Sequence, residues 1–166
     1  MLDEGGPAAV DGRDANDPLA LERQVCFALA VAARSVIGVY RPVLEELGLT
    51  HPQYLVMLAL WERSPLSVTE IARLLQLDLP TVSPLVKRLE AAGYLERRRD
   101  PLDERTLRVT LTDVGRDLRT RALAVPGTVM ARLDITEAEV RTLHAALVPL
   151  IAQSQAALLA SGRSRG

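Results

Sequence analysis

The stretch SVTEIARLLQLDLPTVSPLVKRLEAAGYLERRRDPLDERTLRVTLTDVG, residues 67–115, decides the fold class of this chain. Ser67 and Glu70 have the spacing of a capping box, which predicts that a helix begins at this point. Asp78 is a suitable cap for a second helix, and Gly93 stands where a helix commonly ends. Two helices joined by the short turn QLDLP are therefore expected before the end of this stretch.

Two short alternating segments follow the second predicted helix, YLERR at residues 94–98 and LRVTLT at residues 107–112. Alternation of polar and apolar residues is typical of strands with one buried face. The segment RDPLDE between them contains one proline and four charges, as an exposed hairpin tip does. Two helices followed by a β-hairpin make a winged helix-turn-helix.

Long helical patterns flank this core on both sides. Over residues 19–47, apolar residues recur at spacings of three and four on so wide a surface that contact with more than one neighbour is expected. Thr112 begins another helix, which should break at the segment VPGT near Pro126. Thr136 and Glu139 repeat the capping-box spacing and open a last long helix. The chain is therefore expected to be mainly α, with a small β-hairpin wing.

Composition and motifs exclude several classes of protein. The longest apolar run has nine residues, against the roughly 18 that a membrane span needs, and no signal segment opens the chain. A single cysteine cannot form a disulfide within the chain, so a reduced cytoplasmic setting is the default. His51 and His144 show no metal-ligand spacing. Neither a metal, a cofactor nor an enzymatic activity is expected, and a thiol peroxidase would need threonine and arginine around its cysteine.

The net charge of −1 conceals an asymmetry along the chain. Residues 1–22 contain six acidic side chains and one arginine, a net charge of −5, so the remainder carries +4. Association with DNA depends on where the cations lie rather than on their total. A near-neutral chain with basic residues clustered in the predicted winged helix remains compatible with DNA binding.

The second predicted helix has the side chains that a DNA major groove requires. Short donors and cations are expected on its exposed face, at Thr81, Ser83, Lys87 and Arg88. At the start of the preceding helix, Ser67 and Thr69 can meet a phosphate through hydroxyl and backbone N–H groups.

The hairpin supplies further candidate contacts. Arg105 is placed to reach a minor groove, and Asp103 could hold its guanidinium in position. Arg97, Arg98 and Arg99 are expected to touch backbone phosphates. The alternative is that these charges form a solvated face of a winged helix that binds only protein.

These residues resemble the MarR family of dimeric bacterial transcriptional regulators. The resemblance is carried by residues 67–115, with the family's D-x-R wing at Asp103 and Arg105 and its L-T-x-x-G motif ending at Gly115. It extends over about residues 19–158 and implies a homodimer that binds an inverted-repeat operator in double-stranded DNA.

The resemblance also implies the organisation of the chain. It predicts a single MarR-type domain at residues 19–160 with two dimerisation regions. The composition of the chain predicts disordered tails on either side, at residues 1–18 and 161–166. Within the domain, the DNA-binding core is expected at about 50–115 and the dimerisation helices at about 19–47 and 116–160.

Within that family the segments QVCFAL, YRPVLEELGLT and PQYLVMLALWE are similar to the organic-hydroperoxide-sensing OhrR branch. This similarity implies that Cys26 is the peroxide sensor and that Tyr40 belongs to the site. Two tyrosines expected beside the thiol are replaced by Ala30 and His51. His51 either compensates as an imidazolium that favours a thiolate, or faces solvent and leaves a blunted sensor.

Two functions follow from this resemblance. In the first, a hydroperoxide oxidises Cys26, a small cellular thiol forms a mixed disulfide with it, and a repressor leaves its operator. In the second, a reversible lipophilic or phenolic ligand releases the repressor from a pocket near Tyr40, His51 and Tyr54. Without the resemblance, Cys26 reads as a small apolar residue that fills a helix interface.

Overall fold

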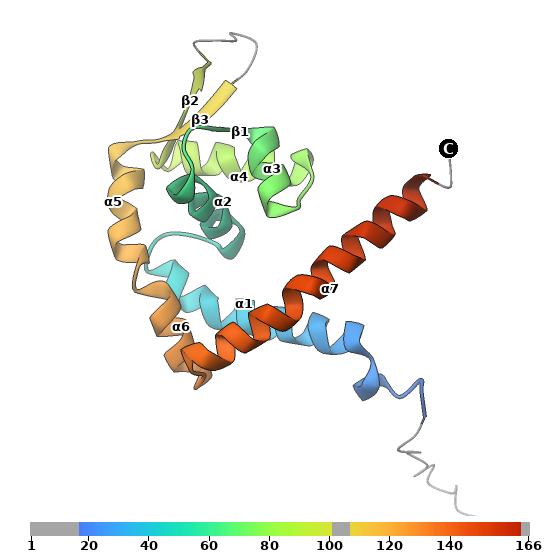
Figure 1. Ribbon diagram of the computed structural model, residues 1–166. Coiled ribbons are helices and arrows are strands. Elements are labelled where there is room, and N and C mark those ends of the chain that lie inside the picture. Colours follow the sequence, from blue (N-terminus) through green and yellow to red (C-terminus); the bar gives the residue numbers. More distant parts are fainter. Residues whose placement is uncertain (1–16, 101–106, 164–166) are drawn as a thin grey trace, which may run out of the picture. The chain divides into compact units, whose positions relative to one another are not determined.

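The computed structural model describes residues 17–100 and 107–163 (Figure 1). The chain divides into two compact units, one ending at Gly38 and a larger one beginning at Val39. The expected disordered tail 1–18 lies outside the described residues except for its last two positions. Within the described chain, helices predominate and the strands form one small sheet, as the sequence predicted.

The N-terminal unit contains a short 3-10 helix, Leu21–Arg23, and most of helix α1, Val25–Glu45. The prediction of one helix from residue 19 is therefore wrong at its start. Gln24 has an extended backbone, and its side-chain amide donates to the carbonyl of Pro18 at 2.7 Å. This contact stabilises a turn at the point where a continuous helix was expected.

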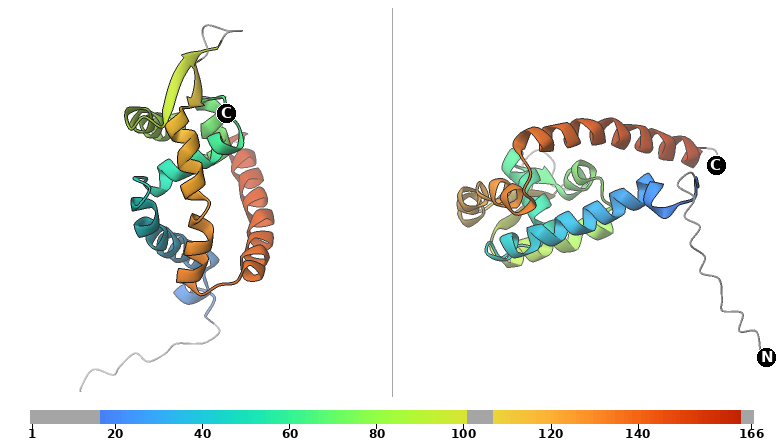
Figure 2. Two further views of the ribbon diagram at one scale, coloured as in Figure 1. Left: turned by 90° about the vertical axis from the view of Figure 1, so that its left-hand side faces the viewer. Right: turned by 90° about the horizontal axis from the view of Figure 1, so that it is seen from below.

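The larger unit contains the remaining elements in the order of the sequence. They are α2 (His51–Glu62), β1 (Leu66–Ser67), α3 (Val68–Leu75), α4 (Leu79–Ala91), β2 (Leu95–Arg99), β3 (Leu107–Leu111), α5 (Asp113–Ala122), α6 (Val125–Leu133) and α7 (Glu137–Arg163). Figure 2 shows the β2–β3 hairpin projecting at one end, with α5 and α6 following each other away from it.

The helix-turn-helix begins and ends where the capping signals predicted. Ser67 accepts a hydrogen bond from the backbone N–H of Glu70, and the Glu70 carboxylate accepts one from the backbone N–H of Ser67. Asp78 caps α4 by accepting from the backbone N–H of Thr81. Gly93 follows α4 with a φ of 81°, a left-handed conformation that glycine adopts without steric cost.

The sheet has three antiparallel strands in the order β1–β3–β2. Strands β2 and β3 lie within one residue of the two predicted strands, and Leu95 pairs with Leu111. Strand β1 was not predicted: it has only two residues, Leu66 and Ser67, and pairs with Val109 and Arg108. So short a strand has no alternation pattern that a sequence could reveal.

The hydrophobic core joins α2, α3, α4 and the sheet. Helix α4 buries the residues that its periodicity predicted, namely Val82, Leu85, Val86 and Leu89. Val56, Met57 and Leu60 of α2 and Ile71 of α3 are at most 1% exposed. Burial of these side chains fixes which face of α4 is left for solvent.

The loop between β3 and α5 fastens the hairpin to the body of the unit. Thr112 donates through its hydroxyl to the Gly93 carbonyl at 2.6 Å and accepts from the backbone N–H of Gly115. The indole N–H of Trp61 donates to the Gly115 carbonyl at 2.9 Å. A Cβ on Gly115 would lie 2.0 Å from the carbonyl oxygen of Tyr94. Only glycine allows this approach.

The C-terminal helices differ from the prediction in two places. The break after α5 falls at Leu123 and Ala124, earlier than the segment VPGT, because Pro126 stands in the first turn of α6, where proline costs no helical hydrogen bond. Helix α7 begins with the predicted Thr136–Glu139 capping box. It continues to Arg163, past the expected start of a tail at residue 161, and the Ser161 hydroxyl donates to the Ala157 carbonyl one turn back.

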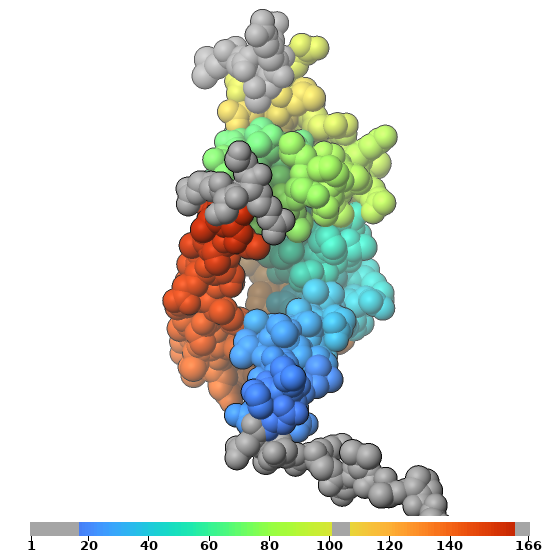
Figure 3. Space-filling model, turned by 90° about the vertical axis from the view of Figure 1, so that its right-hand side faces the viewer, coloured from blue at the N-terminus to red at the C-terminus, as the bar shows by residue number. Residues whose placement is uncertain are grey.

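Helices α1 and α7 are long and apolar enough to cross a membrane by length and composition alone, although each contains interspersed polar residues. The nine-residue apolar run considered in the sequence therefore underestimated how apolar these two helices are over their whole length. Figure 3 shows one face of α7, in orange and red, at the surface of the larger unit. Exposed apolar side chains on it include Leu143, Val148, Ile151 and Leu158. Apolar patches of this kind also serve as contacts between protein chains.

We predict that Gly115→Ala lowers the free energy of unfolding by about 1–3 kcal/mol or more, since the new methyl group must displace the Tyr94 backbone. Urea denaturation followed by circular dichroism measures the loss. Gly127→Ala is the matched control: a Cβ there meets nothing within 4 Å, so stability should stay equal or rise by up to about 1 kcal/mol. Equal stabilities of the two variants would contradict the close approach.

Candidate nucleic-acid interface and sensor residues

The exposed face of α4 has the side chains that the sequence predicted. Thr81, Ser83, Lys87 and Arg88 are all exposed, while the opposite face is in the core. Among the described residues, no ion pair engages Lys87 or Arg88. Two cations and two hydroxyls therefore point outward from one helix of the size that a major groove admits.

The N-terminus of α3 offers a smaller set of donors than expected. The Ser67 hydroxyl oxygen and the Ser67 backbone N–H are both engaged with Glu70 in the capping box. Thr69 is exposed in the first turn. The side chain of Thr69 and its backbone N–H, which has no acceptor within the helix, remain as groups that can meet a phosphate.

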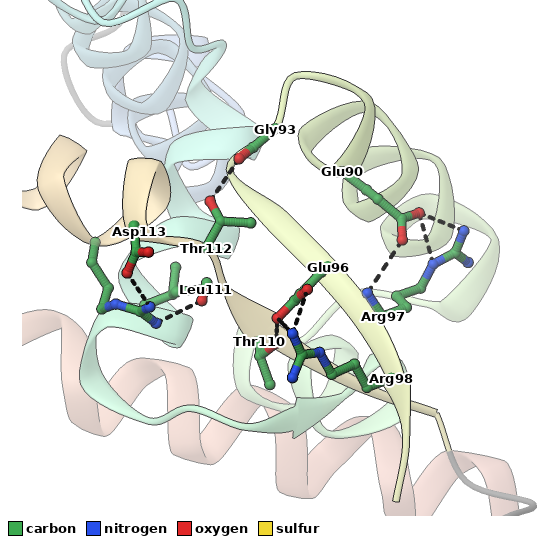
Figure 4. A network of polar contacts seen from close by, with 10 residues as sticks. Glu90, Gly93, Glu96, Arg97, Arg98, Thr110, Leu111, Thr112 and Asp113 are labelled. Carbon is green, nitrogen blue, oxygen red and sulfur yellow. Dashed lines mark hydrogen bonds and ion pairs between the residues drawn. The ribbon is translucent and has the colours of Figure 1, made fainter.

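The hairpin arginines differ in their surroundings. Arg97 contacts Glu90 at the end of α4 through its guanidinium, at 2.6 and 2.9 Å, and through its backbone N–H (Figure 4). These hydrogen bonds from Arg97 hold the pKa of Glu90 below its usual range. Arg97 can reach a phosphate only by leaving Glu90. Arg99 is exposed at the end of β2. Asp103 and Arg105, the expected groove-reading pair, lie outside the described residues.

A residue that the sequence analysis overlooked lies at the centre of the sheet's outer face. Arg108 donates from Nε to Asp100 at 2.7 Å and from Nη1 to Glu70 at 2.6 Å. In the alternation of β3, the Arg108 side chain lies on the other face of the sheet from its neighbour Val109, which is buried. This pattern does not reveal which residues the Arg108 side chain contacts. Its contacts depend on the pairing of β1 with β3, which the sequence did not signal.

The residues expected around the thiol fall into different units. Cys26 is exposed near the start of α1 in the N-terminal unit. In the larger unit, Tyr40 and His51 lie together, with ring centroids 5.5 Å apart in an edge-on arrangement. Burial lowers the pKa of His51 from its usual value, so the imidazole is neutral at neutral pH. The half-buried His51 thus fits neither expectation, the permanent imidazolium or the ring facing solvent.

A cavity of about 490 Å³ lies between α2, α5 and α6. Tyr54, Leu58 and Trp61 line it from α2, and its charged lining residues are Glu62 and Arg119. Of the three residues around which the sequence placed a pocket, only Tyr54 lines this cavity; Tyr40 contacts Tyr54 but is not part of the lining. Apolar walls with few charged groups are typical of small-molecule sites.

These features define a winged helix-turn-helix protein: two capped helices, an exposed basic face on the second helix, and a charged hairpin. The sequence profile of the MarR family matches residues 49–107. The HTH-type transcriptional regulator TtmR of Methylorubrum extorquens (strain PA1) is 47% identical over 132 residues, which cover 80% of this chain and 67% of TtmR. The organic hydroperoxide resistance transcriptional regulator of Bacillus subtilis (strain 168) is 36% identical, over 81% of this chain and 92% of that protein. The chain belongs to the MarR family of transcriptional regulators.

Solved structures of relatives show the same fold with two kinds of bound partner. Reduced AbfR bound to DNA, a protein of Staphylococcus epidermidis, matches with a TM-score of 0.65 and 32% identity, over 80% of this chain and 93% of AbfR. CouR from Rhodococcus jostii RHA1 bound to p-coumaroyl-CoA matches with a TM-score of 0.67 and 27% identity, over 78% of this chain and 92% of CouR.

We predict that Lys87→Gln weakens binding to specific and mixed-sequence duplex DNA alike and lowers the salt slope by about one for each protomer on the DNA. Fluorescence anisotropy at several salt concentrations measures both quantities. Arg132→Gln, which removes the same charge from the exposed end of α6, is the control and should leave the slope unchanged. A slope that falls equally in both variants would mean that α4 does not face the DNA.

Proposed function

We propose that this MarR-family regulator is a cytoplasmic homodimeric repressor that leaves its operator when an organic hydroperoxide oxidises Cys26. The observation that carries the proposal is the exposed thiol of the only cysteine in a chain 36% identical to an organic hydroperoxide resistance regulator. The duplex DNA is held by the face of α4, the N-terminus of α3 and the hairpin, and the protein has no catalytic role.

The apolar surfaces of α1 and α7 support the dimer. Both helices leave large apolar side chains in solvent, among them Phe27, Leu29 and Ile37 of α1 and Leu150 and Ile151 of α7. A second copy would remove this surface from water, at roughly 25 cal/mol for each Å² buried. Pairing of two copies also places two recognition helices on successive turns of duplex DNA, about 34 Å apart.

The oxidation of Cys26 by a hydroperoxide requires no second cysteine in the chain. The thiol sulfur attacks the distal oxygen of the hydroperoxide, the O–O bond breaks, and an alcohol leaves while the sulfur becomes a sulfenic acid. A small cellular thiol then displaces water and forms a mixed disulfide. The sulfur is oxidised and the hydroperoxide is reduced to the alcohol.

His51 bears on how reactive the thiol is. Its lowered pKa makes it a neutral partner at neutral pH, so it supplies no cation that would favour a thiolate. Sensing then depends on the exposure of Cys26 and on the partner copy rather than on an imidazolium. The proposal therefore does not use His51 as a cation beside the thiol, and the half-buried ring does not face solvent as the blunted-sensor reading expected.

We predict that cumene hydroperoxide with a small thiol weakens binding of the wild-type protein by about 5- to 150-fold, the usual range for coupled sites. The DNA is a duplex selected by the wild-type protein from a random-sequence library, and anisotropy reports binding. Cys26→Ser should keep its affinity under the same treatment. Release of the Cys26→Ser protein by the hydroperoxide would overturn the sensor role.

A second candidate function is release by a reversible lipophilic or phenolic ligand. The cavity between α2, α5 and α6 favours it, because aromatic and aliphatic walls are combined with the guanidinium of Arg119. The match to CouR, a relative solved with p-coumaroyl-CoA, supports the same idea. Trp61 is the only tryptophan of the chain and lines the cavity, so its fluorescence reports occupancy directly.

We predict that, if this second function operates, p-coumarate quenches Trp61 and releases the selected duplex from Cys26→Ala protein. Arg119→Gln should weaken the ligand about tenfold or more, since a hydrogen bond to a charged group is lost. Arg121→Gln is the matched control on the same helix: Arg121 donates to the Glu46 carbonyl and does not line the cavity. Unchanged fluorescence and DNA binding would exclude this ligand class for the cavity.

A further inference from the structure

The Arg108 side chain joins three segments that are distant in the sequence. Its backbone lies in the central strand, paired with Ser67 of β1 and Arg98 of β2. Its guanidinium contacts Glu70 in the first turn of α3 and Asp100 directly after the end of β2. The two carboxylates lie 38 and 8 positions away along the chain. One side chain thus links the hairpin to the start of the helix-turn-helix.

The position of Arg108 along the hairpin gives this link its importance. The strands bury Leu95, Val109 and Leu111 near the body of the unit. Farther along the hairpin, no described side chain of either strand is buried. The contacts of Arg108 therefore tie the described hairpin to the body at the point where the apolar core ends.

The geometry is specific to arginine. Nε and Nη1 donate to two carboxylates that belong to different elements, which a single ammonium group does not reproduce. The acceptor on Glu70 is Oε2, the same oxygen that accepts from the backbone N–H of Ser67 at 2.7 Å. The guanidinium is thereby tied to the atom that caps α3. Movement of the hairpin relative to the α3 N-terminus would break this shared contact.

The burial of these groups points to positioning rather than to global stability. The side chains of Arg108 and Glu70 are 31% and 33% exposed, and that of Asp100 is 13% exposed. Ion pairs with this access to water contribute little to the free energy of unfolding. They do restrict the orientation of the strands that they join, because two directional hydrogen bonds must be kept at once.

We propose that Arg108 is a positioning residue for DNA binding, which fixes the spacing between the hairpin strands and the N-terminus of α3 through Asp100 and Glu70. The inference rests on the proposed DNA-binding surface, because Arg97 and Arg99 lie on the hairpin side of the link while Ser67 and Thr69 lie on the other. With the spacing fixed before binding, both sets meet the phosphates without first losing conformational freedom. Arg108 acts through this arrangement and does not itself touch DNA.

The structure contains a matched control for this role. Arg98 lies directly opposite Arg108 on the same face of the sheet. Its guanidinium contacts only Glu96, two positions away on its own strand, among the described residues (Figure 4). Arg98→Met therefore removes the same charge from nearly the same place without freeing the hairpin from α3. Any loss of DNA affinity that comes from the missing charge alone should appear in both Arg108→Met and Arg98→Met.

The experiment compares full-length wild type, Arg108→Met and Arg98→Met on the duplex selected from a random-sequence library. Anisotropy gives the dissociation constant at several salt concentrations, and circular dichroism gives the melting temperature. We expect Arg108→Met to bind about 3- to 30-fold more weakly than Arg98→Met, the size of coupling usual for residues in one network. The two variants should have similar salt slopes, because each has lost one positive charge.

Two further measurements separate positioning from a structural role. Hydrogen exchange should be faster for the amides of residues 107–111 in Arg108→Met than in Arg98→Met, at equal melting temperatures. Glu70→Gln should weaken DNA binding in the wild type and cost nothing further in Arg108→Met, since both changes break one link. Asp100→Asn, which leaves the α3 cap intact, should give a smaller loss of the same kind.

The outcomes distinguish this inference from the function on which it rests. If the wild-type protein selects no duplex, the proposed function fails before any variant is compared. If the wild type binds but Arg108→Met and Arg98→Met lose equal affinity, charge alone accounts for the effect and the positioning role is overturned. Additive losses for Glu70→Gln and Arg108→Met would overturn it as well.

Discussion

At the base of the hairpin, Gly115 lies so close to the Tyr94 carbonyl that no side chain fits between them. Thr112 closes the same junction by donating to the Gly93 carbonyl and capping α5, and Trp61 reaches it from α2. Three elements from distant parts of the chain therefore meet through backbone carbonyls at one point. The direction of the hairpin and the start of α5 both depend on this contact. This dependence explains the glycine that ends the L-T-x-x-G motif.

Charge on the hairpin and on α4 is organised by pairing rather than by simple accumulation. Arg97 is held by Glu90, Arg98 by Glu96, and Arg108 by Glu70 and Asp100. The cations of α4 that the structure leaves exposed, Lys87 and Arg88, have no such acidic partner among the described residues. A chain with a net charge of −1 can thus present a basic recognition helix while its hairpin arginines are largely neutralised and oriented.

The sequence predicted local structure well wherever a short-range signal existed. The capping residues Ser67, Asp78 and Thr136 marked helix starts that the structure confirms, because side chain and backbone meet within three residues. Predictions were wrong where the deciding contact was not visible in a pattern. The turn at Gln24 and the two-residue strand β1 belong to this class.

By itself the sequence determined the order of the long helices and of the two hairpin strands, the buried face of α4 and the exposed set Thr81, Ser83, Lys87 and Arg88. These follow from periodicity and capping, which act over a few residues. Only the tertiary structure decided that Arg108 links β3 to Glu70, that burial lowers the pKa of His51 beside Tyr40, and that a cavity opens between α2, α5 and α6. Each of these depends on separate elements of the chain being brought together by the core, and no local pattern records which elements will meet.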